Sequence, residues 1–295
     1  MKKTIFTGAG VALVTPFNDD FSINYSKLDE LVEFHIENGT DAIIACGTTG
    51  EASTMSREEH LSVVERVVNR ANGRIKVIAG SGSNDTMFAI GTSKGAQALG
   101  VDGLLIVTPY YNKTSQKGLI KHYNMIADSV DLPIIMYSVP GRTGVNILPS
   151  TCAELAKHPN IVAIKEASGN MAQVTEIASL CGDVLDIYSG CDEITVPIMS
   201  VGGIGVISVV SNILPREMHD MCALYLEGKT TEAAKLQFKL YNLCRDMMCD
   251  VNPIPVKTAM NLMGMNAGPL RMPLCETTDD KLAAIKNTMA KLSLI

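Results

Sequence analysis

Short apolar segments recur along this chain at intervals of roughly thirty residues, the length of a strand together with its following helix. Nearly all of them end at Gly, Pro, Thr or Ser, and their lengths and β-branched content are typical of buried parallel strands. We therefore predict eight strands. In order, they cover residues 10–17, 42–47, 76–80, 103–109, 133–139, 161–167, 185–190 and 205–212.

The stretches between the predicted strands have the spacing of amphipathic helices. The clearest of them covers residues 56–71, and the residues on its apolar face are Leu61, Val64, Val67 and Val68. Ser56 opens this stretch and is followed three positions later by Glu59. This capping-box pattern predicts the start of a helix.

Eight strand–helix units in about 225 residues, without a linker, predict a closed (β/α)8 TIM barrel, an α/β fold, over residues 1–226. An open, doubly wound sheet is the alternative, but the first strand is not followed by the G-x-G-x-x-G fingerprint of that fold. Residues 227–295 are mostly helical in pattern, with helices expected over 230–250, 255–263 and 279–294. We expect this C-terminal helical extension to pack on the barrel or on a neighbouring subunit.

The composition excludes several classes of partner. The chain has 295 residues, 46% of them hydrophobic, and a formal net charge of −6 at pH 7. Such a chain can bury one sizeable core, and its acidic balance gives no general attraction for nucleic acid or anionic lipid. No apolar stretch reaches the roughly eighteen residues needed to span a bilayer. We therefore expect no nucleic-acid and no membrane partner.

The cysteines and the start of the chain predict a cytoplasmic protein. No two of the eight cysteines have the spacing of a zinc knuckle or a redox motif, and their apolar neighbours are typical of free thiols in a reducing compartment. The N-terminal residues resemble a signal peptide only superficially, because Gly8, Gly10 and Pro16 interrupt the apolar stretch.

One lysine is predicted to lie where barrel enzymes hold their active sites, at the C-terminal ends of the strands. Lys165 lies near the end of the sixth predicted strand and shares one face with Ala163 and Ala167. The opposite, bulkier face carries Val162, Ile164 and Glu166. Since the bulky face should meet the helices, Lys165 should point into the barrel, where desolvation lowers its pKa and favours Schiff-base formation with a ketone. The alternative is a structural lysine paired with Glu166.

Other polar residues fall at the same predicted end of the barrel. Tyr137 closes the fifth strand, where its hydroxyl could shuttle protons, and Arg142 follows it, where a guanidinium could clamp a carboxylate. Residues 47–51, Gly-Thr-Thr-Gly-Glu, could cradle an anion with backbone N–H and side-chain O–H groups. Each has a structural alternative. Tyr137 could be a packing residue at the rim, Arg142 a surface charge, and residues 47–51 a tight turn.

Histidines offer no competing metal route. All five fall in predicted helices or at helix ends, and none lies at the C-terminal end of a strand. Without an imidazole cluster to hold zinc, a lysine-based aldol reaction is favoured over a metal-dependent one.

Together these motifs resemble the dihydrodipicolinate synthase family, which belongs to the pyruvate-dependent class I aldolases. The resemblance covers essentially the whole chain from Thr7 onward. It is carried by residues 47–51 (GTTGE), 108–112 (TPYYN), 137–144 (YSVPGRTG), 165–168 (KEAS) and 205–208 (GVIS). Each motif is weakly specific alone, but five in order at barrel spacing form a strong signal.

The resemblance implies a catalytic role for four residues. Lys165 would form the Schiff base with pyruvate, and Tyr137 would donate and accept protons beside the imine. Thr48 and Tyr111 resemble the other members of a hydroxyl relay to solvent. In the family the tyrosine matching Tyr111 comes from the neighbouring subunit, which implies a homodimer as the smallest competent unit and commonly a dimer of dimers, a homotetramer.

It also implies four substrate-binding residues. Thr49 matches the residue that holds the pyruvate carboxylate, helped by the backbone near Gly190 and Ile207. Arg142 matches the arginine that positions the relay and receives the carboxylate of the second substrate. The implied substrates are pyruvate and L-aspartate 4-semialdehyde, which are condensed on the pathway to diaminopimelate and lysine. No metal and no organic cofactor is implied, because the protonated imine is itself the electron sink.

Two departures from the family pattern bear on feedback inhibition by lysine. Asn84, His60 and Tyr110 fit the region where inhibited members hold lysine. Arg57, however, stands at a usual histidine position, and Phe88 stands where a glutamate would pair with the lysine ammonium. Arg57 would repel the lysine ammonium, and Phe88 offers no carboxylate to pair with it. We therefore predict weak or absent inhibition by lysine.

Two other functions stay open from the residues. A sister aldolase, such as sialic acid lyase or a keto-deoxy sugar acid aldolase, would share the lysine and the threonine cradle, although Tyr111 with Arg142 favours the synthase. A non-catalytic pyruvate-binding regulator on the same barrel is the alternative from another class.

Overall fold

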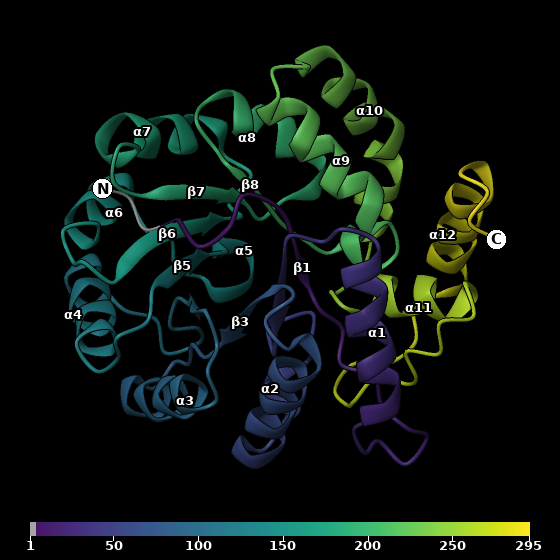
Figure 1. Cartoon of the computed structure of the whole chain (residues 1–295), viewed down its shortest axis with the longest axis horizontal. Coiled ribbons are helices and arrows are strands. Elements are labelled where there is room, and N and C mark those ends of the chain that lie inside the picture. The colour runs from purple at the N-terminus through teal and green to yellow at the C-terminus, as the bar shows by residue number, and fades with distance from the viewer. Residues whose placement is uncertain (1–3) are drawn as a thin grey trace.

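Eight parallel strands close into a barrel in the order in which they occur in the chain (Figure 1). The computed structural model describes residues 4–295, so the first three residues of the predicted barrel region lie outside it. The strands are β1 Gly8–Ala12, β2 Ala42–Ala45, β3 Lys76–Gly80, β4 Gly103–Val107, β5 Ile134–Ser138, β6 Ile161–Glu166, β7 Asp186–Ser189 and β8 Gly205–Ser208. β1 pairs with β8 as well as with β2, which closes the sheet and confirms the predicted TIM barrel.

Helices surround the barrel and continue beyond its eighth strand (Figure 1). They are α1 Tyr25–Glu37, α2 Arg57–Ala71, α3 Thr86–Ala98, α4 Gln116–Ala127, α5 Pro140–Thr143, α6 Pro149–Leu155, α7 Met171–Cys181, α8 Thr195–Ser200, α9 Pro215–Leu226, α10 Thr230–Asp246, α11 Ile254–Leu262 and α12 Asp279–Lys291. Three short 3₁₀ turns, η1 Ala52–Thr54, η2 Asp192–Ile194 and η3 Val210–Asn212, lie between them. α10 packs along α9, and α12 packs against α10 and α11. No helix in residues 4–295 is both long and apolar enough to cross a membrane.

Alternation along the strands separates the core into two apolar layers. The inner layer fills the barrel and includes Ala12, Ile44, Ile78, Leu105, Ile135 and Ile207. The outer layer lies between strands and helices and includes Val11, Ile43, Val77, Leu104, Ile106 and Ile187. Strands buried on both faces read as continuous apolar runs, which is why the sequence pattern located them.

The first strand ends at Ala12, earlier than predicted. Leu13, Val14 and Phe17 are nonetheless buried, and the Phe17 amide donates to the carbonyl oxygen of Ala267 over 3.2 Å. Phe17 therefore lies under the C-terminal segment, whereas the Leu13 and Val14 amides donate to the Ile44 carbonyl oxygen and to Asn212 Oδ1. The predicted eighth strand is also shorter than expected, because β8 ends at Ser208 and its last predicted residues form the 3₁₀ turn η3.

One residue of β6 does not follow the predicted alternation. Val162 was expected to face the helices, but it packs in the inner layer beside Ala163. The β5–β6 register shifts from Ile134↔Ile161 to Ile135↔Ala163, so Val162 is the extra residue of a β-bulge. Simple alternation cannot anticipate a bulge, but from Ala163 onward the predicted inward face, including Lys165, is correct.

The capping box at the start of α2 is formed as the sequence predicts. The Ser56 hydroxyl accepts from the Glu59 amide over 3.2 Å, and the Ser56 amide donates to Glu59 Oε2 over 3.0 Å. Val64 and Val67 of the predicted apolar face are fully buried. α2 is thus fixed directly after the loop that carries the Gly-Thr-Thr-Gly-Glu motif.

Candidate active site

Lys165 and Tyr137 lie side by side at the C-terminal end of the barrel. They are direct partners in the β5–β6 register, and both belong to strands whose inner faces point into the barrel. The Lys165 Nζ atom lies 4.4 Å from the centroid of the Tyr137 ring. The parallel register therefore delivers an amine and a phenol to one place.

The Lys165 amine is buried without a carboxylate partner. Its residue is 5% exposed, and within residues 4–295 no carboxylate lies within ion-pair distance of Nζ. Glu166 points the other way, where it accepts from Gln173 Nε2 over 2.8 Å and from the Ser168 amide. A structural Lys165–Glu166 pair is therefore excluded by geometry.

Burial lowers the pKa of Lys165 to about 8, against the attraction of the nearby Asp192 carboxyl, which favours the charged ammonium. A substantial fraction of the side chain is then a neutral amine at mildly alkaline pH. Such an amine can attack a carbonyl carbon.

Glycine at position 190, directly after β7, makes room beside the amine. An added Cβ at Gly190 would lie 2.6 Å from the Ala167 Cβ and 3.1 Å from the Lys165 Cε. Any side chain there would push into the lysine stem. Ile207 on β8 is fully buried in the inner layer of the same barrel.

A short chain of polar groups leads from Tyr137 toward solvent. Burial raises the pKa of the Tyr137 phenol to about 12, while the charge of Arg142 and a hydrogen bond with Thr48 favour its ionised form. Thr48 and Arg142 are both exposed. Protons could thus pass between a buried phenol and a hydroxyl that reaches water.

Thr48, Tyr137 and Arg142 line a cleft of about 550 Å³. The same cleft is lined by residues that the sequence assigned to an effector region, namely His60, Asn84, Phe88 and Tyr110. The Arg57 guanidinium stacks over the Phe88 ring, 4.4 Å from its centroid. In one subunit the predicted proton relay and the predicted effector region therefore share one opening.

Thr49 is buried next to this cleft, whereas Tyr111 is not brought to it. Thr49 is 2% exposed, and its Oγ1 accepts from Asn252 Nδ2 over 2.9 Å. Tyr111 is 92% exposed and has a φ of +68°, a conformation that non-glycine residues seldom adopt. Its side chain is therefore almost fully open to solvent.

Three polar residues next to the site were not predicted from the sequence. Asn252 contacts Thr49 from the segment between α10 and α11, and Lys257 of α11 forms a buried ion pair with Glu51, Nζ to Oε1 2.7 Å. Asp192 accepts from the amides of Val209 and Val210 and acts on the charge of Lys165. Asp192 comes three residues after the end of β7, so the sequence could have placed it at the C-terminal end of the barrel. Asn252 and Lys257 reach the site only through folding of the C-terminal segment.

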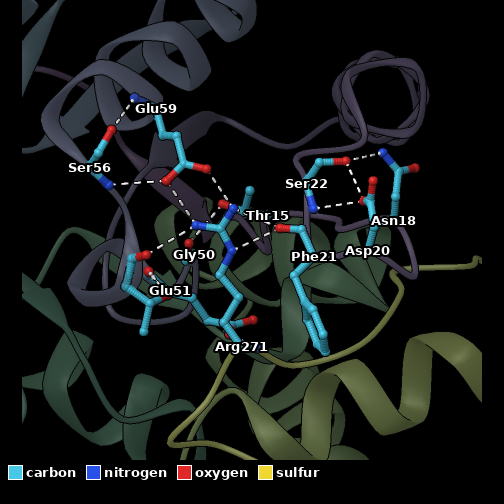
Figure 2. Close-up of polar contacts among 11 residues, drawn as sticks. Thr15, Asn18, Asp20, Phe21, Ser22, Gly50, Glu51, Ser56, Glu59 and Arg271 are labelled. Carbon is cyan, nitrogen blue, oxygen red and sulfur yellow. Dashed lines mark hydrogen bonds and ion pairs between the residues drawn. The ribbon is translucent and has the colours of Figure 1, made fainter.

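Arg271 joins the same loop from the last part of the chain (Figure 2). Its backbone amide donates to Glu51 Oε2 over 2.9 Å, and its guanidinium binds both carboxylate oxygens of Glu59 at 2.6 and 2.9 Å. The guanidinium also donates to the carbonyl oxygens of Phe21 and Thr54. Within residues 4–295, no group of three His, Cys, Asp or Glu side chains is arranged to hold a metal ion.

Comparisons with known proteins agree along nearly the whole chain. Residues 5–292 match the Dihydrodipicolinate synthetase family. A curated relative from Clostridium novyi, 4-hydroxy-tetrahydrodipicolinate synthase, is 54% identical over 286 residues, which cover 97% of this chain and 96% of the relative.

Solved structures agree as closely. Dihydrodipicolinate synthase from Acinetobacter baumannii, solved in complex with pyruvate, superposes with a TM-score of 0.96 at 43% identity and covers 99% of this chain and 100% of its own. The enzyme from Cyanidioschyzon merolae, solved with lysine bound, has a TM-score of 0.95 at 39% identity over 99% and 100% of the two chains.

Proposed function

The chain belongs to the dihydrodipicolinate synthetase family, and from this premise we propose that Lys165 is the residue through which it acts. The protein is a lyase of the class I aldolase type that condenses pyruvate with L-aspartate 4-semialdehyde to 4-hydroxy-tetrahydrodipicolinate in lysine biosynthesis. The observation that carries the assignment of Lys165 is a buried amine with no carboxylate partner among residues 4–295, held against the Tyr137 ring.

The covalent steps follow from the chemistry of a neutral amine. Lys165 Nζ attacks the ketone carbon of pyruvate, and loss of water from the carbinolamine gives a protonated imine. Loss of a proton from the methyl carbon gives an enamine, which attacks the aldehyde carbon of the second substrate. The amino group of that substrate then attacks the imine carbon, which closes the ring and releases Lys165.

Tyr137 is the proton donor and acceptor for these steps, with Thr48 as the next member of the relay. The hydrogen bond between them and the exposure of Thr48 support this assignment. Arg142 lies at the same cleft, where its guanidinium favours transient ionisation of the phenol and can receive the carboxylate of the aldehyde substrate.

The pyruvate carboxylate is bound by the Thr49 hydroxyl and by the backbone near Gly190 and Ile207. The buried position of Thr49 and the space that Gly190 leaves beside Lys165 support this placement. A short α-keto acid held there would present its ketone carbon to the amine.

Tyr111 completes the relay in the active site of a second subunit, in a dimer that pairs further into a tetramer. The nearly complete exposure of Tyr111 and its strained backbone support this role, because such strain is kept where it serves a contact. We also propose a cytoplasmic location, supported by the eight cysteines, which form no disulfide within residues 4–295.

The first prediction concerns covalent trapping. Wild-type protein treated with pyruvate and borohydride should carry one reduced pyruvate adduct, located on Lys165 by peptide mapping. Lys165→Ala should carry none and should lose at least about 10³-fold in turnover, as expected on removal of a nucleophile. Lys76→Ala, which removes an exposed lysine at the opposite end of the barrel, should be trapped normally; an adduct on any other lysine would refute the assignment.

The second prediction follows from the pKa of Lys165, which is lowered to about 8. The neutral amine is the reactive form, so the rate of imine trapping by cyanoborohydride should rise about tenfold from pH 7 to a plateau above about pH 9. Intact-mass kinetics at fixed, sub-saturating pyruvate measure this rate. A rate that keeps rising toward pH 10.5 would mean that Lys165 titrates as an exposed lysine.

The third prediction tests whether Tyr111 acts across the interface. Tyr111→Phe and Lys165→Ala should each be nearly inactive alone. In a mixed dimer the Tyr111→Phe subunit keeps its Lys165 and receives Tyr111 from the Lys165→Ala subunit. One of the two sites is therefore intact. Co-expression should therefore restore about a quarter of the wild-type activity on statistical mixing. If mixed dimers form and activity stays at the level of the parents, Tyr111 does not act on the partner's site.

The fourth prediction concerns inhibition by lysine. Phe88 stands where a glutamate would pair with the lysine ammonium, and the Arg57 guanidinium stacked over its ring would repel that ammonium, so half-inhibition should require more than about 1 mM lysine. A coupled assay measures this directly. The double variant Arg57→His, Phe88→Glu should be clearly more sensitive than the wild type. Sub-millimolar inhibition of the wild-type protein would contradict the prediction.

A further inference from the structure

We infer that the segment between α10 and α11 is part of the pyruvate site and that Asn252 is a positioning residue, which sets the direction of the hydroxyl hydrogen of Thr49. The inference rests on the proposed role of Thr49 as a ligand of the pyruvate carboxylate. The Asn252 side-chain amide would orient the Thr49 hydroxyl so that its hydrogen can be donated to an anion.

The contact that carries it joins residues far apart in the chain. Asn252 is 6% exposed, and its Nδ2 donates to Thr49 Oγ1 over 2.9 Å. A hydroxyl has one hydrogen to donate and two lone pairs that accept. Since one lone pair of Thr49 is occupied by Asn252, the hydrogen is left for another acceptor. A carboxylate, which only accepts, is the matching ligand.

The residues next to Thr49 are fixed by the same C-terminal region. Lys257 Nζ contacts Glu51 Oε1 at 2.7 Å, with both side chains only 1% exposed, and the Arg271 amide donates to Glu51 Oε2 (Figure 2). Glu51 has a φ of +55°, an unfavourable conformation for a residue with a side chain. On the other side, Thr15 Oγ1 donates to the Gly50 carbonyl oxygen over 2.8 Å.

These contacts converge on the loop and leave the Thr49 hydroxyl little freedom. Asn252, Lys257 and Arg271 reach three places within residues 49–51, all from beyond the eighth strand. A preorganised donor of this kind binds an anion without first having to reorient, so its loss should appear in substrate affinity more than in the covalent steps.

The decisive variant is Asn252→Asp, which keeps the size and an acceptor oxygen but removes the donor. The Thr49 hydrogen would then turn to the new carboxylate, and a negative charge would face that of pyruvate. We expect the KM for pyruvate to rise at least about tenfold while kcat changes less than about threefold. Asn261→Asp is the matched control and should leave both constants unchanged, because among residues 4–295 the Asn261 side-chain amide bonds only with the Gly268 backbone.

Two further variants exclude a merely structural effect. Asn252→Ala removes the donor without adding charge and should raise the KM for pyruvate by a smaller factor, about threefold or more, so the test stands even if Asn252→Asp folds poorly. In a Thr49→Val background, Asn252→Ala should add less than about twofold, because both changes act on one hydroxyl.

The outcomes separate this inference from the proposed function. If the wild-type protein is trapped by pyruvate on Lys165 but Asn252→Asp shows an unchanged KM, the amide does not act as a donor to Thr49 and the inference fails alone. Full additivity of Asn252→Ala with Thr49→Val would overturn it as well. If the wild-type protein is not trapped, the proposed function itself fails.

Discussion

The closed parallel barrel is the constraint on which the site depends. Because every strand runs the same way and pairs with two neighbours, the C-terminal ends of all eight meet at one end. The β5–β6 register then makes Lys165 the direct neighbour of Tyr137, although the two are encoded on separate strands. Glycine after β7 keeps the adjacent space open, so the amine is enclosed without being crowded.

Two buried lysines show how environment decides the role of a side chain. Lys165 has no carboxylate partner among residues 4–295, and burial brings its pKa to about 8. Lys257 is also buried, but it faces Glu51, and removing one member of such a pair typically costs about 3–5 kcal/mol because the other charge is left unpaired. The first lysine is left without a charged partner, as its proposed role requires, and the second ties α11 to the β2–α2 loop.

The architecture spreads the candidate active site over the length of the chain. The strands supply the amine and the phenol, and the β2–α2 loop supplies two threonines. The region after the eighth strand reaches back to that loop through Asn252, Lys257 and Arg271. The predicted division into a barrel over residues 1–226 and a helical region over 227–295 therefore describes the order of elements, while the contacts at Thr49 and Glu51 join the two.

The amino-acid sequence by itself determined the barrel and the inward position of Lys165 through the apolar pattern, and the start of α2 through the Ser56–Glu59 capping box, because each depends on periodicity or on near neighbours in the chain. Local patterns could not locate the end of β1, since the apolar run continues past Ala12 to Phe17, whose amide bonds with Ala267 near the end of the chain. The bulge at Val162 depended on the partner strand. Asn252 and Lys257 look like ordinary polar residues of a helical tail, and only tertiary packing, which carries that tail to the β2–α2 loop, decided that they touch the site.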